Sequence, residues 1–123
     1  MINIIKDFKT SELTDTRFIH PVKVSFNLNG KDKTWEAVSS HDSVAILLYH
    51  QEKNAFLLVK QFRAPVYLND INKTYTYELC AGLVDKDKSL IEIAKEEIDE
   101  ECGYDVALSD IQKVTSFFTN VGI

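Results

Sequence analysis

The sequence has little cysteine and no cysteine pattern that would bind a metal. Cys80 and Cys102 are the only two cysteines in 123 residues, and neither belongs to a Cys-x-x-Cys motif. A disulfide framework or a zinc site would need more cysteines, or histidines at ligand spacing. We therefore expect two reduced, buried thiols in a cytoplasmic protein, because disulfides are rare in that compartment.

Long apolar runs and an excess of positive charge are also missing. No stretch approaches the roughly 18 apolar residues of a membrane-spanning helix, and the N-terminus meets charge at Lys6 and Asp7, unlike a signal sequence. The 14 basic residues are outnumbered by 19 acidic ones, which gives a net charge of -5. Because nucleic-acid binding depends on lysine and arginine, we expect neither nucleic acid nor membrane as a partner.

The N-terminal part has the pattern of an antiparallel hairpin. Val22, Val24 and Phe26 alternate with polar residues, which predicts a half-buried strand. Asn29-Gly30 is typical of a tight hairpin turn, and residues 34–38 resume the strand pattern.

Two continuous apolar runs follow, SVAILLYH at 43–50 and AFLLVKQF at 55–62. Such runs are typical of strands buried on both faces, so we expect the middle of a sheet with another layer packed over it. Residues 74–80 and 114–118 predict further strands, and the segment around Pro65 predicts a loop. Together with one helix, these strands indicate an α+β fold.

The helix is predicted over residues 90–102. Ser89 and Glu92 have the spacing of a capping box at its start, and Gly103 is typical of its end. At about 100° per residue, one stripe of this helix is apolar; it consists of Leu90, Ile91, Ala94, Ile98 and Cys102.

Glu97, Glu100 and Glu101 form an acid cluster on this helix. Like charges three and four residues apart repel one another, and the C-terminal half of a helix disfavours anions. A bound Mg²⁺ or Mn²⁺ would offset both penalties, since such cations take carboxylate oxygens and bridge to phosphates. Helix geometry alone also allows a solvated acidic face, so both interpretations stay open at this point.

The residues around the acid cluster resemble a known motif. Residues 82–104 read GLVDKDKSLIEIAKEEIDEECGY and resemble the Nudix box, G-x5-E-x7-R-E-U-x-E-E-x-G-U, in which U is aliphatic. The residues that match their box positions are Gly82, Glu97, Ile98, Glu100, Glu101 and Gly103, with Tyr104 at the final bulky position.

Two box positions differ from the pattern. Lys88 stands where the box has its first glutamate, and Glu96 stands where it has its arginine. We expect Lys88 and Glu96 to form an ion pair of inverted polarity, for which the loop before Ser89 must fold back. The alternative is that Lys88 and Glu96 are neutral surface substitutions that do not interact.

Further segments are similar to the UDP-sugar diphosphatase (UDP-glucose pyrophosphatase) branch of the Nudix hydrolases, which is close to the ADP-ribose diphosphatases. The resemblance implies an α/β/α Nudix sandwich with a mixed sheet. It assigns residues 1–40 to an N-terminal antiparallel β segment that forms a homodimer, and residues 41–123 to the N-terminal part of the Nudix domain. The similar segments are residues 34–35, 41–44, 59–63, 66–67 and 78–85.

The resemblance also implies an activity: hydrolysis of a UDP-glucose-like nucleotide sugar to UMP and sugar 1-phosphate, with Mg²⁺ or Mn²⁺ as cofactor. ADP-ribose is the alternative substrate. Arg63 is expected to contact substrate phosphate, and Trp35 either stacks on the base or packs in the dimer interface. The implied catalytic and metal-binding residues are Glu97 and Glu101, with Glu100 in support and the main-chain carbonyl of Ala81 as a further ligand.

The chain ends at residue 123, where members of the family continue with further strands, a helix and a loop glutamate. We therefore expect a truncated chain whose sandwich is incomplete at the C-terminus. This expectation keeps a second class of function open, that of a non-catalytic Nudix-like module that binds a nucleotide sugar or a protein partner.

Overall fold

The computed structural model describes residues 2–122, which form two compact units. The first unit contains Asp42–Lys113 together with the N-terminal residues up to Lys9, and the second contains Thr10–His41 together with the residues after Lys113. No helix of residues 2–122 is long and apolar enough to cross a membrane.

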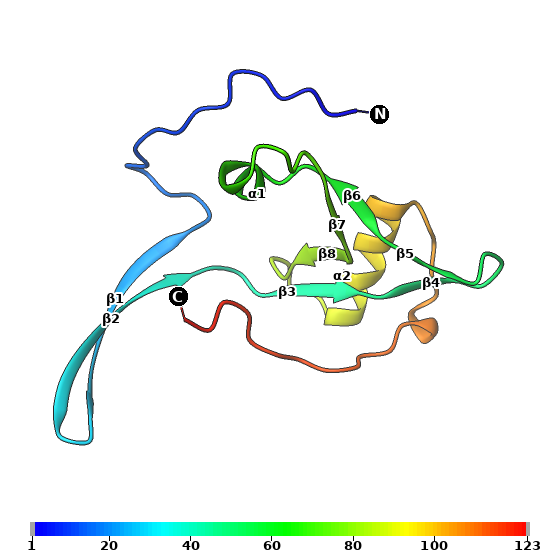
Figure 1. Ribbon diagram of the computed structural model, residues 1–123. Helices are drawn as coiled ribbons and strands as arrows, with labels where there is room; N and C mark the ends of the chain where they lie inside the picture. Colours follow the sequence, from blue (N-terminus) through cyan, green and yellow to red (C-terminus); the bar gives the residue numbers. More distant parts are fainter. Residues whose placement is uncertain (1, 123) are drawn as a thin grey trace. The chain divides into compact units, whose positions relative to one another are not determined.

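The second unit is built on a hairpin. Strand β1 (His20–Leu28) pairs antiparallel with β2 (Lys31–Ser39) over their whole length (Figure 1). The two turn residues, Asn29 and Gly30, have φ angles of 55° and 81°. Positive φ at both positions is what a tight two-residue hairpin turn requires, so the predicted hairpin and its turn are confirmed.

The burial expected for this hairpin is not observed. Val22, Val24 and Phe26 are 46%, 42% and 41% exposed. Val24 lies opposite Trp35, which is also largely exposed, so the two strands share an apolar face. The prediction of a half-buried strand was wrong for the described residues, because no other element of this unit packs over that face.

The first unit contains six short strands: β3 (Ser43–Ile46), β4 (Leu48–His50), β5 (Ala55–Leu57), β6 (Val59–Gln61), β7 (Thr76–Glu78) and β8 (Cys80–Leu83). They pair as β3 with β8, β4 with β5 and β6 with β7. Every strand pair within residues 2–122 is antiparallel, so the parallel pairs of a mixed sheet are not among them. Helices and antiparallel strands together make the fold α+β.

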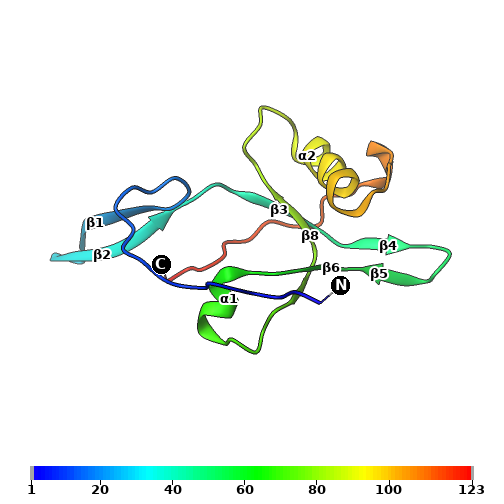
Figure 2. The ribbon, with the colours of Figure 1, turned by 90° about the horizontal axis from the view of Figure 1, so that it is seen from above.

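Helix α2 (Leu90–Glu97) lies against β8 and β3 (Figures 1 and 2). Its capping box is formed as predicted: the backbone N–H of Glu92 donates to the Ser89 hydroxyl, and the N–H of Ser89 donates to the Glu92 carboxylate. The buried core consists of Cys80, Ile93, Ala94 and Ile98. Ile93 is thus buried, whereas Leu90, which was predicted to belong to the apolar stripe, is 42% exposed.

The α-helical geometry ends earlier than predicted. From Ile98 to Cys102 the chain continues as a wider π-helical turn, η1, and Gly103 ends it with a φ of 74°. A π-helical turn bonds each N–H five residues back instead of four. The predicted end at Gly103 is therefore confirmed, while the last turn before it is wider than an α-helix.

Three other expectations were wrong. The apolar runs are not buried on both faces, because Leu47, Phe56 and Leu58 are 60%, 58% and 53% exposed. Residues 114–118 form no strand, since no strand of the described part pairs with them. The segment around Pro65 forms the short helix α1 (Ala64–Asn69), which tolerates proline in its first turn; a 3₁₀ turn, η2, follows at Leu108–Asp110.

Candidate active site

The acid cluster lies where α2 changes into η1. Glu97 is the last residue of α2, and Glu100 and Glu101 belong to η1. Since β8 packs against both segments, Glu97 and Glu101 can lie beside the strand that precedes them in the motif.

Gly82 allows the side chain of Glu97 to lie directly against β8. A methyl group added at Gly82 would overlap the Cγ, Cδ and Oε1 atoms of Glu97. Any other residue would therefore force the carboxylate away from the strand. The glycine at the head of the motif is required by this close approach, because its φ is not in the left-handed region.

Glu101 lies beside the neighbouring strand residue. The backbone N–H of Ala81 donates to its Oε2 across 3.4 Å, a long contact. Strand β8 thus has Gly82 facing one carboxylate and Ala81 facing another. The role expected for the Ala81 carbonyl as a metal ligand stays a prediction.

Burial and the neighbouring acids dominate the electrostatics of Glu97. Burial raises the pKa of Glu97 above its ordinary value, and repulsion from Glu100 and Glu101 raises it further. Burial also raises the pKa of the Cys80 thiol to about 12, with smaller contributions from Cys102 and Glu101. Cys80 therefore stays protonated at neutral pH.

A divalent cation fits this donor set. No group of three or more acidic, histidine or cysteine side chains within residues 2–122 is placed so that it could form a metal cage, so Glu97, Glu100 and Glu101 are not brought together as one ligand set. Mg²⁺ usually does without such a cage, since it binds one or two carboxylates and completes its octahedron with waters and substrate phosphates. The carboxylates beside β8 are hard oxygen donors of that kind, and their mutual repulsion would fall when a cation is bound.

The inverted ion pair predicted from the motif is confirmed. The Lys88 ammonium donates to Oε1 of Glu96, and a second lysine, Lys86, lies 3.2 Å from Oε2. The bonds to Lys88 and then to Lys86 lower the pKa of Glu96. Lys86 was not predicted from the sequence, because a lysine in a charged loop has no distinguishing pattern.

Arg63 is held by an acid of the neighbouring strand. Its Nε and Nη2 atoms donate to the two carboxylate oxygens of Glu78, each across 2.9 Å, and the Thr76 hydroxyl donates to the same carboxylate. The bond to Glu78 raises the pKa of Arg63, and Glu101 contributes electrostatically. Arg63 is thus oriented at the end of β6, within electrostatic range of the acid cluster.

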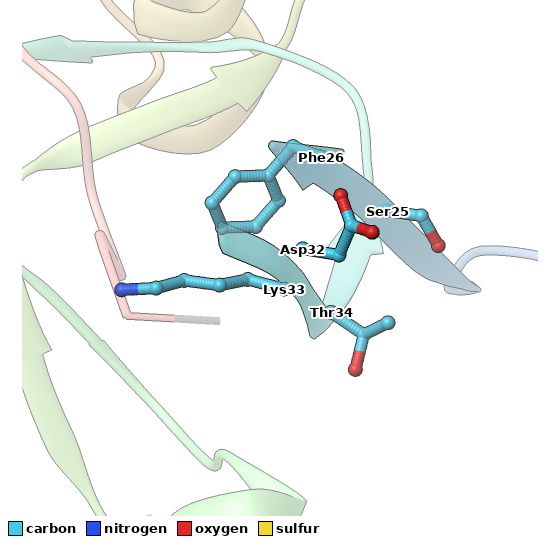
Figure 3. Close-up of a pocket in the computed structure, with 5 residues that line it drawn as sticks. All are labelled: Ser25, Phe26, Asp32, Lys33 and Thr34. Atoms are coloured by element: carbon cyan, nitrogen blue, oxygen red, sulfur yellow. The ribbon is translucent and has the colours of Figure 1, made fainter. Parts of the chain in front are cut away.

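Trp35 belongs to the other unit, and its expected contact with the substrate base or with a second copy stays a prediction. It is 60% exposed, and its indole N–H donates to the Gly122 carbonyl at 3.1 Å. An open hollow on the same hairpin contains none of the expected site residues (Figure 3). Its lining consists of Ser25, Phe26, Asp32, Lys33 and Thr34.

Comparison with known proteins identifies relatives with a common type of activity. No family model matches the chain. It is 35% identical over 132 residues to uridine diphosphate glucose pyrophosphatase NUDT14 of Bos taurus, with 86% of this chain and 60% of the relative covered. It is 32% identical over 126 residues to GDP-mannose pyrophosphatase of Cronobacter sakazakii, with 98% and 62% covered. The chain thus spans about three fifths of the length of these relatives.

The contact between Gly82 and Glu97 predicts a selective loss of metal binding. In Gly82→Ala, the flexible end of Glu97 can swing away, so stability should change little while affinity for Mn²⁺ falls about tenfold or more. Calorimetric titration with Mn²⁺ and thermal denaturation measure the two effects. Gly122→Ala is the control, because a methyl group there meets no atom within 4 Å. Unchanged Mn²⁺ affinity in Gly82→Ala would show that the position of Glu97 is unimportant.

The raised pKa of Glu97 predicts a pH-dependent stability without metal. A carboxyl group with a raised pKa in the folded state destabilises that state once it ionises. In EDTA, the Glu97→Gln variant should therefore have a higher melting temperature than the wild type at pH values above the folded-state pKa of Glu97. The gain should shrink as the pH falls and vanish below 4.5, the ordinary pKa of a glutamate side chain. Thermal denaturation from pH 4 to 8 tests this, and a gain that persists at pH 4 contradicts it.

Proposed function

This chain belongs to the Nudix hydrolase superfamily, and from that premise we propose that it hydrolyses the diphosphate of a nucleotide sugar. The substrate is a UDP-glucose-like compound, and the products are UMP and sugar 1-phosphate. The cofactor is Mg²⁺ or Mn²⁺, held by Glu97 and Glu101 with Glu100 in support and the Ala81 carbonyl as a further ligand.

One observation carries the proposal: the approach of Glu97 to Gly82 at the junction of α2 and η1. A purely solvated acidic face would let each carboxylate extend into water, where repulsion is screened. Here one acid lies against β8 with a raised pKa, and a second, Glu101, is directed at the same strand. This arrangement supports a shared cation instead.

The cation and Arg63 have different roles in the proposed hydrolysis. When bound, the cation neutralises the diphosphate and lowers the pKa of a water molecule. Hydrolysis adds one water across a bridging P–O bond: the water oxygen bonds to one phosphorus, the bridging oxygen leaves on the other product, and the protons of the water pass to the leaving phosphate and to solvent. Glu78 holds Arg63 by two of its nitrogen atoms, which fixes the guanidinium so that its remaining donors can face a phosphate oxygen.

Glu101→Gln is expected to abolish hydrolysis of UDP-glucose in the presence of Mg²⁺, because it removes a charged ligand from the cation. Asp99→Asn is the matched control: it also removes one acidic charge from η1, but from an exposed residue outside the acid cluster. Release of UMP and sugar 1-phosphate is measured by a phosphatase-coupled assay. Full activity in Glu101→Gln refutes the assignment.

The same assay ranks the substrates. UDP-glucose, GDP-mannose and ADP-ribose are compared at equal concentration on the 123-residue chain. We expect UDP-glucose to be cleaved with the highest kcat/KM. Binding of all three without turnover would instead support the non-catalytic module.

We also propose that the hairpin joins two copies of the chain. Its exposed face holds Val22, Val24, Phe26 and Trp35, and an apolar patch of this kind marks an interaction site. Val24→Asp should therefore convert a dimer to a monomer in sedimentation equilibrium. Val114→Asp is the control, since Val114 is an exposed valine outside the hairpin. A wild-type monomer, or a dimer in both variants, contradicts the proposal.

A further inference from the structure

Two lysines share the carboxylate of Glu96. The Lys88 ammonium bonds Oε1, and the Lys86 ammonium lies 3.2 Å from Oε2. One ammonium group is enough to neutralise one carboxylate, so this group of three side chains has a surplus positive charge.

A tight turn brings the two lysines to the same carboxylate. The backbone N–H of Lys88 donates to the Lys86 carbonyl at 2.9 Å, and the start of the loop is fixed by the Val84 N–H, which donates to the Asp42 carbonyl at 2.8 Å. Their side chains are similarly accessible, 47% for Lys86 and 44% for Lys88. The two residues therefore differ mainly in what else surrounds them.

The charge of Lys86 acts on the acid cluster as well as on Glu96. It interacts electrostatically with Glu100 and Asp85, and it also acts on Glu97. The Lys88 ammonium is bonded to Oε1 of Glu96, and its charge is not among the main causes of the shifted pKa of Glu97. We therefore take Lys86 as the surplus cation, because its charge acts on the acid cluster as well as on Glu96.

We propose that Lys86 is a substrate-binding residue that leaves Glu96 to Lys88 and bonds a non-bridging oxygen of the diphosphate. The inference rests on the proposed function for the place where the diphosphate binds. A diphosphate brought to the acid cluster by a cation adds negative charge beside Lys86. An exposed ion pair such as that of Lys86 with Glu96 is weak, and a lysine on a flexible stem can exchange one anionic partner for another.

A pair of matched variants tests this role. Lys86→Met and Lys88→Met each remove one ammonium group from Glu96 and keep the apolar stem. Lys86→Met should raise KM for UDP-glucose, and the Kd for inorganic pyrophosphate measured by calorimetry with Mg²⁺, about tenfold, the value of one charged hydrogen bond. Lys88→Met should leave both within about twofold, and Lys86→Arg should retain most of the binding.

The outcomes separate this inference from the proposed function. Equal effects of Lys86→Met and Lys88→Met on pyrophosphate binding would mean that both lysines only hold Glu96, which overturns the inference even if the chain is an active hydrolase. A chain that cleaves no nucleotide sugar but binds Mg²⁺-pyrophosphate through Lys86 would refute the hydrolysis and retain the inference. Absence of pyrophosphate binding by the wild-type chain overturns the role of Lys86.

Discussion

The close approach of Glu97 to the backbone at Gly82 is the constraint on which the candidate site depends. It requires a residue without a side chain at Gly82, and it requires α2 to be held at a fixed distance from β8. The buried residues Ile93, Ala94 and Ile98 provide that second condition, because they pack the helix against the strand. A very small core thus has a positional function beyond its contribution to stability.

Charge is distributed unevenly around this contact. Acids gather at the C-terminal end of the helix, where the helix dipole opposes them, whereas Glu96 is neutralised by Lys86 and Lys88 and Glu78 by Arg63. The three acids of the acid cluster, by contrast, form no ion pair with any of the described residues. On an ordinary helix surface, acidic side chains at this spacing would be expected to have basic partners, since unpaired like charges three or four residues apart repel.

Sequence signals between neighbouring residues were sufficient to predict local structure. The turn at Asn29-Gly30 and the capping box at Ser89 were predicted correctly, because each depends on residues that are neighbours in the chain. The ion pair of Lys88 with Glu96 followed from the motif register. The partner of Arg63 did not, since the pairing of β6 with β7 that brings Glu78 near is a long-range property. Burial was overestimated for the same reason: an apolar run does not reveal what covers it.

The π-helical turn η1 places the second half of the acid cluster on a helical path with more than the usual 3.6 residues per turn. Such a turn is equivalent to one residue inserted into an α-helix. Deleting a single residue between Ile98 and Cys102 would restore the regular α-helical period, and the wider turn that carries Glu100 and Glu101 would be lost. This stretch of the chain should therefore tolerate substitution at its exposed positions far better than any change in its length.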